Sequence, residues 1–172
     1  MKNLLKVCLV VSVLFFFSIS ANAQKALKFG HLDFAELYSS MPAQDSVKQI
    51  YNDYAQSLKT TLEQMQNELQ NKYADYQSNI ATMSDIIKQT KEKEMQDLQN
   101  RMEEFNTQAQ KDLQAKEAEL TNPLIEKAQN AVKEVAKENG YSYIFNSTGG
   151  LLLYAQPSDD IMPLVKKKLG IK

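Results

Sequence analysis

Few side chains in this sequence have the types and spacing that chemistry requires. His31 is the only histidine, and Cys8 is the only cysteine. The carboxylates are scattered along predicted helices, without a glycine-rich phosphate loop or a cluster of metal-ligand residues. His31 falls on a short predicted strand, where we expect a structural or partly exposed role. The sequence therefore predicts no enzyme, no cofactor and no metal site.

Residues 1–23 have the pattern of a cleavable signal peptide. Lys2 and Lys6 precede an apolar run from Val7 to Phe17, and Ala21-Asn22-Ala23 is a small-x-small cleavage pattern. The apolar run is short for a membrane span, so a retained anchor is only the alternative. A lipoprotein would carry cysteine where this chain has Gln24. We expect an exported, soluble mature chain.

Cleavage would change the composition of the chain. Cys8, Lys2 and Lys6 would leave with the signal peptide, so the mature chain would contain no thiol and no disulfide. Its 18 basic residues against 21 acidic residues give a net charge of −3. General nucleic-acid binders usually carry a basic excess, so this balance argues against a nucleic-acid partner.

The segment from residue 43 to residue 139 makes up more than half of the chain and must position its functional side chains. It contains no glycine and a single proline, Pro123, and consists mostly of strong helix formers. Asp45 or Ser46 is expected to begin a first long helix. Thr82 or Ser84 is expected to cap a second helix from about Asp85, after a reversal near residues 79–85. At Pro123 the second helix either breaks and restarts or bends.

Apolar residues follow a regular period in the first of these helices. Tyr51, Leu62 and Tyr73 are eleven residues apart, which is about 3.67 residues per helical turn. This period predicts an apolar stripe on one face with little supercoiling. The stripe consists of Tyr51, Tyr54, Leu58, Leu62, Met65, Leu69, Tyr73, Tyr76 and Ile80. The second helix carries a looser stripe that Lys91 and Lys116 interrupt, so the two helices are predicted to pack as an antiparallel hairpin.

The two ends of the chain predict a small β-containing body. Residues 27–32 alternate as a short strand, with Leu27, Phe29 and His31 on one side, and Asp33 can cap a short helix over 34–40. Gly140 is expected just after the second long helix. Residues 141–145 and 151–154 predict a β-hairpin around a Gly-Gly turn, and a last helix begins near 160–163. Because these few strands cannot form a sizeable core, we expect other copies of the chain to complete the body.

These elements define the predicted organisation and an α+β fold class. A signal peptide covers 1–23, and the N-terminal strand and short helix of the body cover 24–42. The helical hairpin, or arm, covers 43–122. Residues 123–172 supply the end of the long helix, the β-hairpin and the C-terminal helix of the body.

The two ends of the mature chain resemble the Skp/OmpH family. The resemblance rests on Gly30-His31-Leu32-Asp33, Gly140 to Phe145, Leu152 to Ala155, Asp160-Ile161 and Val165 to Leu169. It covers essentially all of the mature chain, including the glycine-free hairpin. Members of this family are homotrimeric periplasmic chaperones. They hold unfolded outer-membrane proteins without ATP, in a cavity between three helical arms on a β-barrel-like body.

The resemblance implies a periplasmic holdase whose partners are unfolded outer-membrane proteins and two further copies of itself, without stable membrane insertion. The aromatic and methionine residues of the arm are the candidates for client contact: Tyr54, Met65, Tyr76, Met83, Met95, Met102 and Phe105. The apolar strand residues are the candidates for the oligomer interface: Phe29, Tyr143, Phe145, Leu151, Leu153 and Tyr154. The first expectation for these arm residues is that they form the seam between the two helices, and client contact is the alternative for part of their surface.

One feature departs from the family pattern, and one alternative function stays open. The best-known members of the family are strongly basic, whereas this mature chain is acidic, so apolar contacts should matter more than charge steering. The alternative function is a coiled-coil scaffold or spacer that binds one folded envelope partner.

Overall fold

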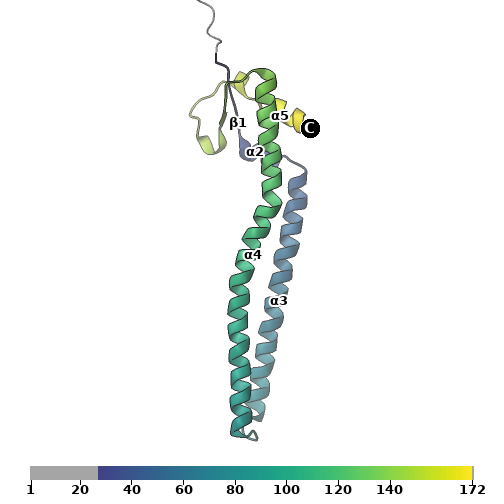
Figure 1. Cartoon of the computed structure of the whole chain (residues 1–172), viewed down its shortest axis with the longest axis vertical. Helices are drawn as coiled ribbons and strands as arrows, with labels where there is room; N and C mark the ends of the chain where they lie inside the picture. Colours follow the sequence, from purple (N-terminus) through teal and green to yellow (C-terminus); the bar gives the residue numbers. More distant parts are fainter. Residues whose placement is uncertain (1–26, 172) are drawn as a thin grey trace, which may run out of the picture.

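The protein consists of a long helical hairpin that extends from a small body of helices and two strands (Figure 1). The computed structural model describes residues 27–171, so the predicted signal peptide lies outside the described residues. The body contains β1 (Phe29–Leu32), α2 (Phe34–Ser39), β2 (Tyr143–Asn146) and α5 (Met162–Leu169). The predicted α+β class with a helical arm on a small body is confirmed for the single chain.

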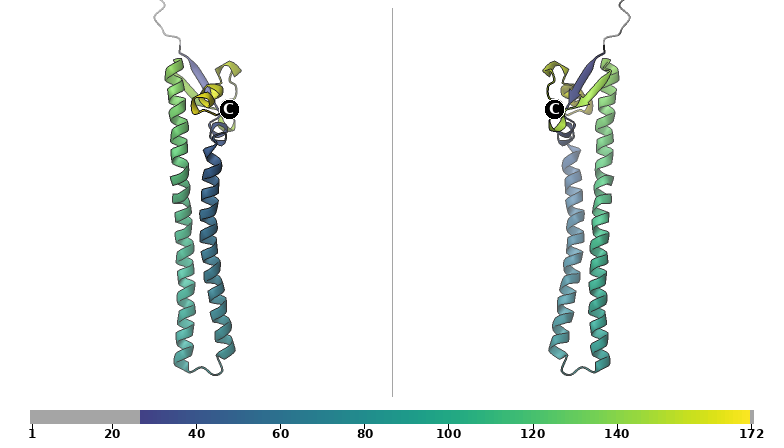
Figure 2. Two further views of the ribbon diagram at one scale, coloured as in Figure 1. Left: turned by 90° about the vertical axis from the view of Figure 1, so that its right-hand side faces the viewer. Right: turned by 90° about the vertical axis from the view of Figure 1, so that its left-hand side faces the viewer.

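The arm is formed by α3 (Ala43–Asn79) and the first part of α4 (Asp85–Asn139). The two helices run side by side over the length of the hairpin in both views of Figure 2. The Ser84 hydroxyl accepts a hydrogen bond from the Ile87 amide and caps α4. Thr82, the other predicted cap, instead donates to the carbonyl of Asn79.

The beginning of α3 differs slightly from the prediction. The helix starts at Ala43, two residues before Asp45, and no side chain caps it. The residue before it, Pro42, already has helical backbone angles. Because proline fixes φ near the helical value, it suits the start of a helix without any help from a polar cap.

Helix α4 is continuous through Pro123. Proline has no N–H, so the carbonyl of Glu119 four residues earlier loses its intrahelical partner. Both Pro123 and Glu119 lie on the exposed side of the helix. The freed carbonyl can therefore bond to water, and the helix does not break and restart at Asn122. The end of α4 is as predicted, since Gly140 follows it with φ of 70°.

The two strands pair in parallel, with Phe29 opposite Tyr143 and Leu32 opposite Asn146. The predicted hairpin between residues 141–145 and 151–154 is therefore wrong for the single chain. Residues 146–148 bind the start of α2 instead, because the Asn146 side chain accepts from the Phe34 amide and Thr148 accepts from the Ala35 amide. Thr148–Gly150 forms a 3₁₀ turn, and residues 151–154 form no strand.

The core of the body lies between α4, α2, α5 and the inner side of β1. It contains the buried residues Leu32, Leu37, Met41, Leu124, Ala128, Ala131, Val135, Ile161, Met162 and Val165. Gly30 is needed where β1 crosses this core, because a Cβ there would lie 2.9 Å from Ile161 Cγ2 and 3.0 Å from the Tyr141 ring. Within residues 27–171, none of the helices is both long and apolar enough to cross a membrane.

Candidate functional surfaces of the arm and the body

The contact between the two arm helices is shallow. No residue of α3, all of which the structure describes, is fully buried. On α4 the arm contributes only Leu98, which is fully buried, and Ala109, which is 8% exposed. Most of the remaining stripe residues are half-buried and two on α3, Tyr73 and Ile80, are exposed, so the seam between the helices has few close-packed contacts.

All seven candidates for client contact lie along this seam and are half-buried: Tyr54, Met65, Tyr76, Met83, Met95, Met102 and Phe105. They therefore pack between the arm helices and also present part of their surface to solvent. Met83 lies at the tip of the hairpin, between exposed Ile80 and Ile86. The structure gathers these residues in a line rather than in one pocket.

The seam departs from the predicted eleven-residue period towards the tip. Tyr73 is 56% exposed, and the seam position is taken by its neighbour Lys72. The seam residues of the facing helix, from Lys88 to Ala109, follow alternating steps of three and four. This heptad spacing is that of helices that wind around each other. The seam therefore passes over Lys72 and leaves Tyr73 on its flank.

Polar side chains join the two helices on one flank of the seam near the tip. Lys72 Nζ lies 3.1 Å from Glu94 Oε2, and Lys91 Nζ lies 2.6 Å from Asp75 Oδ2. The Lys91 ammonium donates to Asp75 and holds the pKa of that carboxyl below its ordinary value, while Asp75 raises the pKa of Lys91. These ion pairs define a charged flank.

The Tyr76 hydroxyl crosses the seam at the same level. It donates a hydrogen bond to Glu92, and this bond raises the pKa of the Tyr76 phenol. Tyr76, a candidate for client contact, thus also fixes the register between the helices. The ion pairs of the charged flank and this hydrogen bond together hold α3 and α4 to each other in the tip half of the hairpin.

The opposite flank of the seam forms a groove of about 480 Å³. Lys72 lies in the seam and pairs towards the charged flank, whereas Tyr73 points about 100° away from it and faces the opposite flank. We call this site the amide groove, because three of its residues are glutamines. Its lining consists of Leu69, Gln70, Tyr73, Ala74, Glu92, Met95, Gln96 and Gln99.

The sequence indicates Met95 as a candidate for client contact and places Leu69 and Tyr73 on the apolar stripe, but it singles out neither the glutamines nor the groove. The signal that identifies Tyr73 is the change from an eleven-residue to a seven-residue period, which depends on the facing helix.

A second groove, of about 340 Å³, lies in the body between β2 and α4 and is lined by residues such as Phe34, Val132 and Ile144.

The candidates for the oligomer interface form an exposed apolar surface on the body. Phe29, Tyr143 and Phe145 are 46%, 58% and 45% exposed. Phe29 lies against both of the others, with ring centroids 5.9 and 6.1 Å apart. Within residues 27–171, β2 has a strand partner on only one edge.

The loop after β2 is still more exposed. Leu151, Leu153 and Tyr154 are 74%, 102% and 79% exposed. A single soluble chain gains nothing from such exposure of large apolar side chains in sequence. We call the strand aromatics and these loop residues together the body apolar face.

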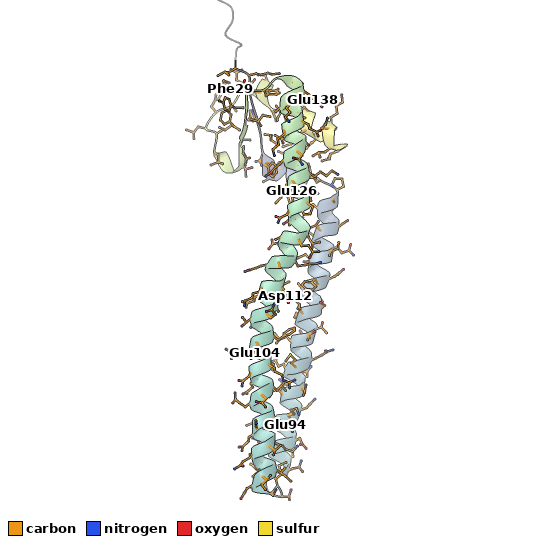
Figure 3. The ribbon with its side chains drawn as sticks, viewed as in Figure 1. Phe29, Glu94, Glu104, Asp112, Glu126 and Glu138 are labelled. Atoms are coloured by element: carbon orange, nitrogen blue, oxygen red, sulfur yellow. The ribbon has the colours of Figure 1, made fainter. Side chains whose placement is uncertain are left out.

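Carboxylates do not gather into a site in the described part of the chain. Figure 3 shows Glu94, Glu104 and Asp112 at successive levels of the arm, with Glu126 and Glu138 beside the body. Among residues 27–171, no three histidine, cysteine, aspartate or glutamate side chains lie together as metal ligands do.

His31 holds the segment before α5 against the edge of β1. Its Nε2 lies 3.1 Å from the carbonyl oxygen of Gln156. A carbonyl only accepts, so Nε2 carries the proton, and Nδ1 is a buried acceptor without a partner among the described residues. The His31 ring thus links β1 to the segment before α5 through this hydrogen bond, which is a structural role.

Comparison with known proteins gives consistent results over nearly the whole described chain. The profile of the family described as outer membrane protein (OmpH-like) matches residues 28–169. The chaperone protein Skp of Pectobacterium atrosepticum is 29% identical over 154 residues, which is 87% of this chain and 90% of that protein. The chaperone protein Skp of Photorhabdus luminescens is 28% identical over 156 residues, covering 88% and 91%.

A solved structure has the same fold. The crystal structure of an OmpH-like protein from Caulobacter crescentus superposes with a TM-score of 0.74 over 83% of each chain, at 15% sequence identity. The long hairpin and the small body are therefore an arrangement that occurs in an experimentally determined structure.

Proposed function

The chain belongs to the OmpH-like family, and from this membership we propose that it is a periplasmic holdase chaperone. It binds unfolded outer-membrane proteins without ATP, in a cavity between helical arms, and prevents their aggregation. Residues 1–23 direct the chain to the periplasm and are then removed. Relatives named chaperone protein Skp support this proposal over about nine-tenths of their length.

The observation that carries the proposal is the shallow seam of the arm. A holdase must offer apolar surface to many clients without collapsing around any one of them. The arm presents flexible methionines and amphipathic tyrosines that are only half-buried. Such side chains adapt to many shapes and bind each one weakly.

The working form is a homotrimer in which the body apolar face is the interface. The free edge of β2 and the exposed loop containing Leu151 and Leu153 favour this assignment. A strand from a neighbouring copy would satisfy the backbone groups of that edge and cover the aromatic rings. Residues 24–42 and 123–172 form the body of each copy, and residues 43–122 form its arm.

Charge distinguishes this chain within the proposal. The arm, residues 43–122, has fourteen acidic and nine basic residues, for a net charge of −5. The rest of the mature chain has nine basic and seven acidic residues, for a net charge of +2. An acidic arm repels anionic lipid surfaces, so client binding depends chiefly on apolar and hydrogen-bonding contacts.

The direct test is suppression of aggregation. Residues 24–172 are mixed with a urea-unfolded outer-membrane barrel protein, the urea is diluted, and turbidity is followed without ATP. The proposal predicts clear solutions at stoichiometric amounts of the chain. Unchanged turbidity, together with tight binding to one native envelope protein, would instead establish the scaffold function.

A further inference from the structure

The two flanks of the seam near the tip differ in chemistry. The charged flank carries the Lys72–Glu94 and Asp75–Lys91 ion pairs. The amide groove, on the other flank, contains one charged residue among its eight lining residues, Glu92. That carboxylate already accepts the hydrogen bond from Tyr76. The groove therefore suits an uncharged ligand, while the opposite flank is occupied by its own ion pairs.

The lining of the groove combines apolar contact with hydrogen-bonding capacity. Leu69, Ala74 and Met95 supply apolar surface, and Tyr73 adds a ring that is 56% exposed. The Tyr73 hydroxyl is held by Gln77, whose Nε2 donates to it at 2.8 Å. The ring therefore has a fixed position on the flank although it is not covered.

The glutamine side chains are not equally free. The Gln96 amide donates to Asn100 at 3.1 Å. Within the described residues, the side chains of Gln70 and Gln99 form no hydrogen bond with protein atoms. Each therefore offers donors and an acceptor, which are the groups that a peptide unit can bind. These two amides lie on different helices, one from α3 and one from α4.

We infer that the amide groove binds an extended, uncharged segment of client polypeptide, with Gln70 and Gln99 bonding its peptide groups and one apolar side chain resting against Leu69 and Met95. This inference rests on the proposed chaperone function and names a binding site for it. The groove volume of about 480 Å³ accommodates only a few residues of chain.

The geometry of an extended chain fits this site. Successive side chains of a strand point to opposite sides, so apolar residues at alternate positions would face the groove and polar residues would face away. Strands of membrane β-barrels have this alternation. The groove would thus recognise alternation and backbone rather than a particular sequence, as a chaperone for many barrel proteins requires.

The test uses a pair of variants of equal charge. Gln70→Glu with Gln99→Glu keeps the size of both groove side chains but removes their N–H donors and adds charge. Gln64→Glu with Gln114→Glu makes the same change at exposed arm positions outside the groove. Helix content by circular dichroism and mass by light scattering confirm that both variants are intact.

The probe is a short fluorescein-labelled peptide that alternates valine with serine and has blocked, uncharged ends. We expect the groove variant to raise the Kd of this peptide about tenfold, because a lost donor and an added charge both oppose a neutral ligand. The control variant should leave the Kd within about twofold of the parent. A peptide with lysine in place of one serine should recover part of the loss in the groove variant only.

A third variant, Tyr73→Ala, removes the exposed wall without touching the seam and should also weaken binding. Equal affinities for the groove and control variants would overturn the inference, and so would a Tyr73→Ala variant that binds like the parent. Failure of the chaperone function appears separately, as a parent protein that does not suppress aggregation of the unfolded barrel protein. If the parent suppresses aggregation but the groove variant binds the peptide with the parent's affinity, client contact lies elsewhere on the arm.

Discussion

Gly30 shows how closely the body packs at a single residue. A side chain at this position meets Ile161 at 2.9 Å and the Tyr141 ring at 3.0 Å. Lys28 Nζ lies 4.0 Å from the centroid of the same ring, which limits its retreat. We expect Gly30→Ala to lower the free energy of unfolding by about 1–3 kcal/mol.

Urea unfolding followed by circular dichroism measures this change. The control is Ser39→Ala, at an exposed position of α2 outside the core. A Gly30→Ala protein with the midpoint of the parent would show that β1 does not press against α5 and Tyr141 as described.

The Asp75–Lys91 pair predicts a dependence of the tip on pH. The folded pKa of Asp75 is lowered, so its stabilising effect is complete above its unfolded value of about 3.9 and is lost as pH falls through the folded pKa. The folded pKa of Lys91 is raised, so its effect is present below about 10.4 and is lost at higher pH. The pair is thus expected to hold α3 and α4 together near the tip of the hairpin at pH values between these two limits.

Asp75→Asn tests this assignment. The thermal midpoint of the variant should lie below that of the parent at neutral pH, and the difference should vanish at pH below the folded pKa of Asp75. Added salt should also reduce the difference, because the pair is half-exposed. A difference that is constant from neutral to strongly acidic pH would exclude the ion pair as its cause.

At the scale of the helices, Leu98 is the main anchor of the arm. It is the only arm residue with no exposed surface among those described, and apart from Ala109 the other seam residues are partly exposed. We expect Leu98→Ala to cost about 2–5 kcal/mol and to loosen the tip half of the hairpin before the body unfolds. Leu62→Ala, at a half-buried seam position, should cost less.

Hydrogen exchange resolves the two regions. The expected result is faster exchange in the tip half of α3 and α4, with unchanged protection in residues 124–135. Uniform acceleration over arm and body would mean that they unfold as one unit.

Sequence reasoning succeeded where an element is set by its own residues. Asp33 caps α2, Ser84 caps α4 and Gly140 ends α4, because each of these effects is local. It failed where a distant segment decides. Residues 146–148 bind the start of α2, more than 110 positions away, and so are not free to form a hairpin turn.

The candidate site follows the same rule. The seam could be read from apolar periodicity, but the flank to which Tyr73 belongs depends on the winding of α3 against α4. A stripe of eleven-residue steps and one of seven-residue steps share their first positions and diverge only after several turns. The amide groove therefore became visible only with both helices in place.

At the scale of the whole molecule, the body apolar face predicts assembly. Leu151→Asp with Leu153→Asp places charges on this face and should dissociate the oligomer, because an uncompensated charge in an apolar interface is costly. Ile86→Asp is the matched control, since Ile86 is 77% exposed but lies at the tip of the arm. Sedimentation should show smaller particles for the loop variant alone. Equal masses for parent and loop variant would remove residues 151–153 from the interface.

We propose that a trimer of this chain encloses one unfolded client. The most direct measurement is the mass of the complex, determined by light scattering on residues 24–172 mixed with an unfolded outer-membrane barrel protein without ATP. We expect a trimer alone and, with client, one soluble species that contains three copies of the chain and one client molecule. A monomer that forms no soluble complex would contradict both the assembly and the cavity.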